Sequence, residues 1–539
     1  MPNGAQIMVK CLENEGVSVV FGYPGAAICP FYDALLDSNI RHILVRQEQN
    51  AGHAASGYAR ACGKPGVCVA TSGPGATNLV TGLATAYMDS IPIVAITGQV
   101  RSDLLGRDVF QEVDITGCCE PFTKHSYLVK RTEDLPRVFK EAFHIATTGR
   151  PGPVLIDIPI DIQQNTLEHF VYPEKADIIG YKPRTQGHPL QIKRAAELIQ
   201  TAKRPLLFAG GGVLSSGAKR DLVAFAEETG IPVVSTMMGI GVMPSEHPLY
   251  LGMLGSHGVP AANRAIHEAD VLILCGARVG DRAVASPDQI TEKAKVIHID
   301  IDPAEIGKNM KAHIPIVGNI RLVLGSLREK VRYHVPEDWA NTVQDWKANL
   351  RRCPQPVDGF VEPRTFIRDF SGMLPSKAIL VADVGQNQIW CANNFKIREG
   401  RFLTTGGMGT MGYSLPAAVG AKVARPSRQV VAVCGDGAFQ MCMNELGTIA
   451  QNHLGVKIII MRNVRLGMVR ELQDKQYQGR HAATILDETL NFRTIASAYG
   501  IPSADANSNE EALQAARNML ATHGPYLLVC NVSPDTPSI

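Results

Sequence analysis

The chain has 539 residues, 45% of them hydrophobic, and a formal net charge of +2 at pH 7. This composition predicts a globular chain of several domains, and the nearly balanced charge argues against a nucleic-acid or acidic-membrane partner. No apolar run is long enough to cross a membrane, and the first residues predict an amphipathic helix instead of a signal or transit sequence. Twelve scattered cysteines without metal-type spacing indicate reduced thiols, so we expect a cytoplasmic protein.

Short apolar runs that alternate with helical patterns predict an α/β fold of three doubly wound domains with parallel sheets. We expect these domains at residues 1–165, 190–345 and 364–539. The segments between them, 166–190 and 354–363, contain prolines and little periodicity and are expected to be linkers. The first and third domains share a pattern of strand, glycine turn and helix without a strict repeat, so we expect a similarity of architecture only.

The first domain contains apolar runs with the length and composition of buried strands. These runs lie at 17–21, 43–45, 66–70, 91–96 and 154–158.

Two turns of the first domain carry residues suited to a ligand. The stretch GYPGAAI, with Gly25 at its centre, is a glycine-rich turn between a strand and a helix. Glu48 follows a short strand and opens a helix, where a carboxylate is favourable on electrostatic grounds alone. Taken alone, a carboxylate in this position is more often structural than catalytic.

The second domain contains strands that end in polar or glycine-rich turns. The first of these strands runs into three successive glycines at 210–212. Asp300 and Asp302 follow a later strand and form either a metal pair or, more commonly, residues that contact a ribose or cap the next element.

The third domain contains a βαβ unit with chemistry at both strand ends. A strand at 430–434, a Gly-Asp-Gly turn, one amphipathic helix and a strand at 456–461 follow one another. Asp436 lies at the end of the first strand and Asn463 at the end of the second, the sheet edge where ligands bind. A carboxylate and an amide oxygen suit Mg²⁺, and a glycine-lined helix N-terminus suits a phosphate. The unit therefore predicts a site for a metal-bound diphosphate.

With these stretches assembled, the chain resembles the catalytic subunits of acetohydroxyacid (acetolactate) synthases, a family of thiamine-diphosphate-dependent enzymes. The resemblance covers nearly the whole chain and includes TSGPGATNLVTGLATAYMDSIP, TKHSYLV, GRPGPVLIDIP, HIDIDPAEIGKN and GMGTMGYSLPAA, in the family's order. It implies three α/β domains that carry, in turn, the thiamine pyrimidine site, FAD, and the diphosphate with Mg²⁺. It also implies an active site formed between two subunits of a homodimer or higher homo-oligomer, and leaves a small regulatory subunit open.

The resemblance implies which residues contact thiamine diphosphate and its metal. Asp436, Asn463 and the backbone carbonyl of Arg465 would hold Mg²⁺, although Arg462 stands where the family usually has a further Asn. The carbonyl of Gly409 would accept from the 4′-amino group, and Met411 would hold the cofactor in its bent shape. The other cofactor-binding positions are Gly25, Val384, Gly385, Gln386, Asn387, Gly437, Ala438, Gly467 and Met468.

The resemblance also implies FAD in a structural role, because the reaction needs no redox step. Gly280 and Asn319 depart from this pattern, since acidic residues are common at both positions. The matching positions are Arg150, Gly210, Gly211, Gly212, Thr236, Met237, His257, Gly276, Arg278, Asp300 and Ile301.

The implied reaction decarboxylates pyruvate and joins its two-carbon unit to a second 2-ketoacid. Glu48 would hydrogen-bond pyrimidine N1′ and so activate the cofactor, while Gln111 and Lys124, with Phe110, would face the site. For Lys124, a place in an exposed Lys-His pair on a loop is an equally favoured alternative. Arg282 would hold the acceptor's carboxylate through a bidentate contact.

Two alternatives differ in class. The first alternative is another thiamine enzyme of the same fold, either a simple 2-ketoacid decarboxylase or an acyltransferase. Arg282, the Phe110–Gln111 pair and the FAD-type centre of this chain argue against it. A non-catalytic relative would be expected to have lost Glu48, Asp436 or Asn463.

The acceptor pocket is where the chain departs most from the family that it resembles. Leu472 stands where the anabolic enzymes have Trp, and Ser256 stands where Met is common. A looser and more polar wall would discriminate less by the acceptor's extra methylene.

Overall fold

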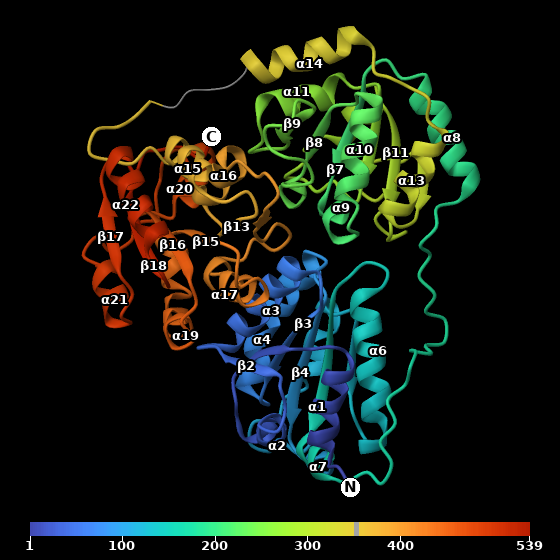
Figure 1. The fold of residues 1–539 in the computed structure, drawn as a ribbon, viewed down its shortest axis with the longest axis vertical. Helices are drawn as coiled ribbons and strands as arrows, with labels where there is room; N and C mark the ends of the chain where they lie inside the picture. The colour runs from blue at the N-terminus through green and yellow to red at the C-terminus, as the bar shows by residue number, and fades with distance from the viewer. Residues whose placement is uncertain (350–354) are drawn as a thin grey trace.

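The structure is a computed structural model that describes residues 1–349 and 355–539. It contains three six-stranded, all-parallel sheets with flanking helices, which Figure 1 shows in blue, green and orange to red. The predicted α/β class with three doubly wound domains is confirmed. None of the helices in the described part of the chain is long and apolar enough to cross a membrane.

The first sheet is built from six strands in the order β2-β1-β3-β4-β6-β5. Its central strands are buried on both faces, as expected of a parallel sheet covered by helices. The strands are β1 (Val19–Gly22), β2 (Arg41–Leu44), β3 (Gly66–Ala70), β4 (Ile93–Gln99), β5 (His125–Leu128) and β6 (Pro153–Pro159). The helices are α1 (Gly4–Asn14), α2 (Cys29–Leu35), α3 (Glu48–Cys62), α4 (Pro74–Met88), α5 (Ile115–Cys119), α6 (Leu135–Thr147) and α7 (Ile160–Gln164).

The second sheet has the order β12-β11-β10-β7-β8-β9. Counted along the chain from the β9 edge, this is the order 3-2-1-4-5-6 of dinucleotide-binding sheets, whose ligand lies where the strand order reverses. Here the reversal lies between β7 and β10. The strands are β7 (Pro205–Ala209), β8 (Val233–Ser235), β9 (Tyr250–Met253), β10 (Val271–Cys275), β11 (Lys295–Asp300) and β12 (Ile314–Val317). The helices are α8 (Pro189–Gln200), α9 (Gly211–Ser215), α10 (Lys219–Thr229), α11 (Pro260–Glu268), α12 (Pro287–Thr291), α13 (Ile320–Lys330) and α14 (Glu337–Asn349).

The third sheet has the order β14-β13-β15-β16-β18-β17, which is the order of the first sheet when strands are counted along each domain. The two domains therefore share a topology that their sequences do not repeat. The strands are β13 (Ile379–Ala382), β14 (Arg401–Leu403), β15 (Val430–Gly435), β16 (Val456–Arg462), β17 (Ser503–Ala506) and β18 (Tyr526–Asn531). The helices are α15 (Pro363–Met373), α16 (Gln386–Asn394), α17 (Ser414–Ala424), α18 (Asp436–Gln440), α19 (Leu446–Gln451), α20 (Gly467–Gln476), α21 (Phe492–Ala498) and α22 (Asn509–Ala521).

The expectation of one amphipathic helix between β15 and β16 is wrong. The segment forms α18, a 3-10 turn at Met443–Glu445, and α19, because Cys442 leaves the helical conformation at φ −139°. The break places the carboxylate of Glu445 against the first domain, where it accepts from Arg46 N at 2.7 Å and Asn50 Nδ2 at 2.9 Å. The contact of Glu445 with the first domain therefore takes the place of a continuous helix between β15 and β16.

The first linker forms no helix or strand between an isolated bridge at Thr166 and the start of α8 at Pro189. It runs along the outside of the molecule from the first domain to the second (Figure 1). In the second linker, the described residues reach α15 without a helix or strand, and Pro354 lies outside the described residues. The exact domain boundaries stay predictions.

Helices α3 and α17 join the first and third domains, and Figure 1 shows them side by side. A Cβ atom at Gly57 would lie 2.0 Å from Ala417 O, and one at Gly420 would lie 1.8 Å from Ala54 O. Since side chains cannot approach backbone this closely, only glycine permits this contact at both positions. Ser56 Oγ and Tyr413 Oη, 2.9 Å apart, add a buried hydrogen bond between α3 and the residue that precedes α17.

Candidate functional site

Asp436 and Asn463 lie at the carboxyl ends of neighbouring parallel strands, because β15 and β16 pair in register up to Gly435 and Met461. Both side chains are buried, with 3% and 6% exposure. Asp436 Oδ2 accepts from Val464 N at 2.8 Å, and Asn463 Oδ1 accepts from Arg465 N at 3.1 Å. The two predicted metal ligands are therefore brought to one place, each oriented by a backbone N–H.

The backbone directly after Asn463 is strained. Val464 has φ +58°, a left-handed conformation that a β-branched residue rarely adopts. Its N–H bonds to Asp436 in this conformation, so the strain accompanies the placement of the carboxylate. Burial raises the pKa of Asp436 to about 6, and a divalent cation beside it would favour the charged form. One carboxylate and one amide oxygen at a buried strand edge fit Mg²⁺.

The predicted diphosphate loop lies at the start of α16. Gly385 has φ +135°, which is accessible only to glycine, and it precedes the first helical N–H groups. The Asn387 amide is used internally, because Nδ2 donates to Asp383 O at 2.8 Å. Gln386 lies between Asn463 and α20, and a Cβ at Gly467 would lie 2.0 Å from Gln386 Oε1. Val384, Gly385, Gln386, Asn387 and Gly467 thus lie in the segments beside Asp436 and Asn463, the two predicted metal ligands.

The turn between Gly406 and Gly412 is where the three domains meet. Asp89 of the first domain accepts from Gly407 N at 2.8 Å, and a Cβ at Gly406 would lie 2.6 Å from Met238 Sδ of the second domain. Gly409 has φ +66° with open space where a side chain would lie. This leaves room beside the Gly409 backbone, where the resemblance places the cofactor's amino group.

Asp383 was missed by sequence reasoning. Its fully buried carboxylate accepts from Val384 N and Gly412 N at 2.9 Å and from Ser414 N at 2.8 Å. It ties the diphosphate loop to the glycine turn, while burial raises its pKa. The signal was a carboxylate directly after a buried strand and directly before a glycine loop.

Met411 lies beside the Gly-Asp-Gly turn. A Cβ at Gly437 would lie 3.7 Å from Met411 Cε, and closer still to Leu466 and Leu486 side chains. Met411, Gly437 and the buried Ala438 therefore share one apolar neighbourhood.

Glu48 is the first residue of α3, and its Oε2 accepts from Asn78 Nδ2 at 2.9 Å. A Cβ at Gly75 would lie 3.3 Å from Glu48 Oε1, so the carboxylate lies over the N-terminal turn of α4. Among the described residues of this single chain, no hydrogen bond or ion pair joins Glu48 to Asp436 or Asn463. Gly25 lies close by in the fold, packed against Thr71 at the end of β3.

The loop that carries Phe110 and Gln111 lies at the same edge of the first sheet. Gln111 has φ +61° and packs on Gly73, where a Cβ would lie 2.9 Å from Gln111 Cβ. Phe110 is 86% exposed. A large apolar side chain so open to solvent is available to a ligand or to another chain.

Lys124 points away from these residues. Its ammonium donates to Ile145 O, to Thr148 O at 2.7 Å and to Tyr181 Oη at 3.2 Å, at the C-terminal end of α6. Burial lowers its pKa to about 8. The alternative of an exposed loop pair does not describe it, and its predicted role in the active site stays a prediction.

Except for Arg150, which lies in the first domain before β6, the predicted FAD residues lie at the strand ends of the second sheet, on both sides of the switch point. A Cβ at Gly210 would lie 2.1 Å from Gly276 O, so the two glycine turns touch where the strand order reverses. The remaining members of this set also lie at or after strand ends: Gly211, Gly212, Thr236, Met237, His257, Arg278, Asp300 and Ile301.

Two arginines near this edge differ in their surroundings. Arg150 is paired with Glu305 at 2.7 Å and with Asp302 at 3.4 Å. The Arg278 guanidinium makes no hydrogen bond or ion pair within the described residues, while burial, and then Arg150, lower its pKa. A half-buried guanidinium that has no hydrogen-bond or ion-pair partner among the described residues, at a dinucleotide switch point, fits an anionic cofactor. Asp302 pairs with Arg150 and accepts a hydrogen bond from Ala304 N.

Arg282 lies on a loop of the second domain and has an exposed side chain. Its carbonyl accepts from Ser256 N at 2.9 Å, which places the two acceptor-pocket residues on one surface. Arg282 and residues Glu471 and Lys475 of α20 all influence the pKa of His257, so α20 lies near this surface. Leu472 on α20 is half exposed.

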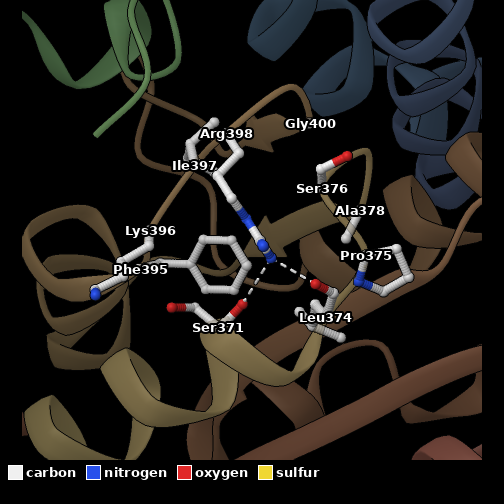
Figure 2. A pocket seen from close by; sticks show the side chains of 10 residues that line it. All are labelled: Ser371, Leu374, Pro375, Ser376, Ala378, Phe395, Lys396, Ile397, Arg398 and Gly400. Atoms are coloured by element: carbon white, nitrogen blue, oxygen red, sulfur yellow. Dashed lines mark hydrogen bonds between the residues drawn. The ribbon is translucent and has the colours of Figure 1, made fainter. Parts of the chain in front are cut away.

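Figure 2 shows a small hollow elsewhere in the third domain, between the end of α15 and the loop before β14. Its volume of about 10 Å³ suffices for one water at most. Arg398 donates to the carbonyls of Ser371 and Leu374 there, which satisfies the C-terminal end of α15. The hollow is structural and contains none of the predicted site residues.

Comparison with protein families agrees with this geometry. Three family models match the chain: thiamine pyrophosphate enzyme, N-terminal TPP binding domain, at residues 2–118; central domain, at 192–327; and C-terminal TPP binding domain, at 383–530. The third match contains the Asp436 and Asn463 site.

Similar proteins cover nearly the whole chain. The probable acetolactate synthase large subunit of Methanocaldococcus jannaschii is 47% identical, over 98% of this chain and 92% of its own length. The acetolactate synthase of Arthrospira platensis is 46% identical, over 99% and 94%. The acetolactate synthase large subunit of Corynebacterium glutamicum is 46% identical, over 95% and 84%.

These matches confirm the predicted thiamine-diphosphate-dependent, acetolactate-forming enzyme. The chain belongs to the acetolactate synthase large-subunit family of thiamine pyrophosphate enzymes.

Proposed function

We propose that this chain decarboxylates pyruvate and joins its two-carbon unit to a second 2-ketoacid, with thiamine diphosphate bound through Mg²⁺ at Asp436 and Asn463. The observation that carries the proposal is the buried pair of oxygen ligands at adjacent strand ends, beside the Gly385 loop. When bound, the cofactor supplies the carbon nucleophile for the carbonyl of pyruvate. The protein holds, orients and shields it.

Glu48 is proposed to hold the pyrimidine ring of the cofactor through a hydrogen bond at N1′. Its carboxylate lies at the carboxyl end of the first sheet and is fixed by Asn78. The Glu445 contact to Arg46 N and Asn50 clamps the start of α3 from the third domain, and so limits the movement of Glu48.

Two copies of the chain are proposed to complete the site, with Glu48 from one and the metal ligands from the other. The lack of a direct contact between these residues within the described part of one chain supports this arrangement. Exposed apolar side chains near both halves support it too, among them Phe110, Met408, Met441, Val469 and Leu472. A cytoplasmic location and a separate regulatory subunit stay predictions.

The substrate residues are assigned by their positions. Arg282 offers an unburied guanidinium to the carboxylate of the acceptor, since only the adjacent Asp281 lies near it among the described residues, at 3.7 Å. Gln111 is held by its contact with Gly73 and supplies an amide near the edge that carries Glu48. A simple decarboxylase would need no second carboxylate site, so the position of Arg282 favours carboligation.

Asp436→Ala is expected to weaken binding of thiamine diphosphate in the presence of Mg²⁺ by more than about 100-fold, because the site loses its only charged ligand. Calorimetric titration of the cofactor, with circular dichroism as the check on folding, measures this. Retention of the cofactor with the wild-type affinity would show that the metal lies elsewhere.

Glu48→Gln keeps the side-chain shape and removes the charge. It is expected to slow hydrogen–deuterium exchange at C2 of bound thiamine diphosphate by about 100-fold or more, a typical contribution of a positioned acid–base group. Exchange followed by NMR after acid quench gives the rate. An unchanged rate, with the cofactor fully bound, would remove Glu48 from cofactor activation.

FAD is proposed as a structural cofactor at the β7–β10 switch point, with Arg278 facing its diphosphate. The purified protein is expected to be yellow and to release FAD on denaturation. Arg278→Gln should lower the FAD content, whereas Arg220→Gln, on exposed surface of α10, should leave it unchanged. A colourless protein that is fully active without added flavin would contradict the assignment.

The acceptor preference follows from Leu472 and Ser256. One methylene in a close apolar pocket is worth roughly 1–3 kcal/mol, and the half-exposed Leu472 offers a poorer wall than an aromatic ring. Given equal pyruvate and 2-ketobutyrate, the enzyme is expected to prefer 2-ketobutyrate only weakly, and Leu472→Trp should raise the preference. Quantifying acetolactate and acetohydroxybutyrate tests this.

The same assay contains its own controls. With pyruvate alone, acetolactate is expected, and acetaldehyde as the main product would instead identify a decarboxylase. Strong dominance of acetohydroxybutyrate in the wild-type protein would show that other residues form the pocket wall.

A further inference from the structure

Gln386 joins the metal site to the last residues of the chain. Its Oε1 accepts from Asn463 Nδ2 at 2.8 Å, and its Nε2 donates to Glu471 Oε1 at 2.6 Å and to Thr536 O at 2.9 Å. The side chain is buried, with 6% exposure. All three of these hydrogen bonds are internal, so the Gln386 side-chain amide has no free N–H for a diphosphate.

The partners of Gln386 determine which way its amide points. A carboxylate and a carbonyl only accept hydrogen bonds, so both require the NH₂ group of Gln386 on their side. A reversed amide would place Oε1 against two acceptors at hydrogen-bond distance. The Gln386 oxygen must therefore face Asn463.

The orientation of Asn463 follows from that of Gln386. Because Gln386 presents an acceptor, Asn463 must turn its Nδ2 toward it, and its Oδ1 then lies on the opposite side of the amide. There Oδ1 accepts from Arg465 N at 3.1 Å. Only the oxygen of an amide can bind a cation. The polarity of the Asn463 amide, that is, which side carries Oδ1 and which carries Nδ2, therefore decides whether Asn463 can serve as a metal ligand.

Glu471 is itself held by the C-terminal segment. Its Oε1 accepts from Ser538 N and its Oε2 from Ser538 Oγ, both at 2.7 Å. Arg470 binds Pro534 O at 3.1 Å and Asp535 at 2.8 Å, and Trp390 Nε1 binds Pro537 O at 2.9 Å. The segment 533–538 is thus attached to α16 and α20, the helices that flank the metal site.

We propose that Gln386, Glu471 and the segment 533–538 form a hydrogen-bond relay that sets the amide polarity of Asn463 and so prepares the site for Mg²⁺. Gln386 and Glu471 are positioning residues, since neither is assigned to the metal or the substrate by this relay. The proposal rests on the proposed metal role of Asn463 and changes the assignment of Gln386 from a diphosphate contact to the middle of the relay. The relay also needs glycine at position 467, because a Cβ on Gly467 would lie 2.0 Å from Gln386 Oε1.

The test measures Mg²⁺ affinity of the full-length protein by calorimetry at saturating thiamine diphosphate. Gln386→Met keeps length and volume but removes the relay. Glu471→Ala removes one of the two acceptors that orient Gln386, together with the hydrogen bonds that hold the segment carrying the other, Thr536. Each is expected to weaken Mg²⁺ binding by about 10–100-fold, the range for lost partners of metal ligands. The double variant should be no weaker than Gln386→Met alone, because both changes interrupt one relay.

A matched control is Asp474→Ala, which removes a carboxylate one turn further along α20. Asp474 binds His481 at 2.6 Å and takes no part in the relay, so its Mg²⁺ affinity should stay at the wild-type value. Ser538→Ala removes one bond at the far end of the relay and should weaken Mg²⁺ binding only severalfold, because Ser538 N still donates to Glu471. This mild variant keeps the test available if a larger change impairs folding.

The outcomes separate the relay from the proposed function. Wild-type Mg²⁺ affinity in Gln386→Met or Glu471→Ala would overturn the relay, as would effects that multiply in the double variant. If Asp436→Ala also bound Mg²⁺ and cofactor normally, the site itself would be misplaced. If Asp436→Ala lost binding while both relay variants kept it, the site would stand and the relay alone would be wrong.

Discussion

Helices α3 and α17 approach so closely that their backbones touch at Gly57 and Gly420. This contact joins the first and third domains, and residues larger than glycine would clash at both positions. Since α3 begins at Glu48 and α17 follows the Gly406–Gly412 turn, the contact also fixes how these two segments of one chain lie relative to each other. The two domains have the same strand order. The packed helices α3 and α17 therefore join two sheets of the same topology.

Three carboxylates hold the loops of the site in place; those of Asp383 and Glu445 are fully buried and that of Asp89 is partly buried. Asp383 gathers three N–H groups from the diphosphate loop and the glycine turn, Asp89 holds that turn from the first domain, and Glu445 holds the start of α3 from the third. A buried carboxylate is costly unless its hydrogen bonds are satisfied, so each one defines a single loop position. The site is therefore shaped before any cofactor binds.

The second domain differs in kind from the other two. Its strand order is that of dinucleotide-binding sheets, its glycine turns touch at the switch point, and Arg278 there is half-buried and unpaired among the described residues. It meets the other domains at Met238 and through the Arg150–Glu305 ion pair. A cofactor at this position would stabilise the joint between domains without taking part in the chemistry.

The sequence by itself determined the central strands, the Gly-Asp-Gly turn and the positions of Asp436 and Asn463, because these depend on local periodicity and on the ends of neighbouring parallel strands. Short edge strands such as β5 and β14 were missed, since segments of only three or four residues carry little periodic pattern. The break between α18 and α19, the partners of Lys124 and the polarity of Asn463 were decided only by the tertiary structure. Each depends on a hydrogen-bond partner far away in the chain, and residue spacing does not encode which distant donor or acceptor will lie opposite.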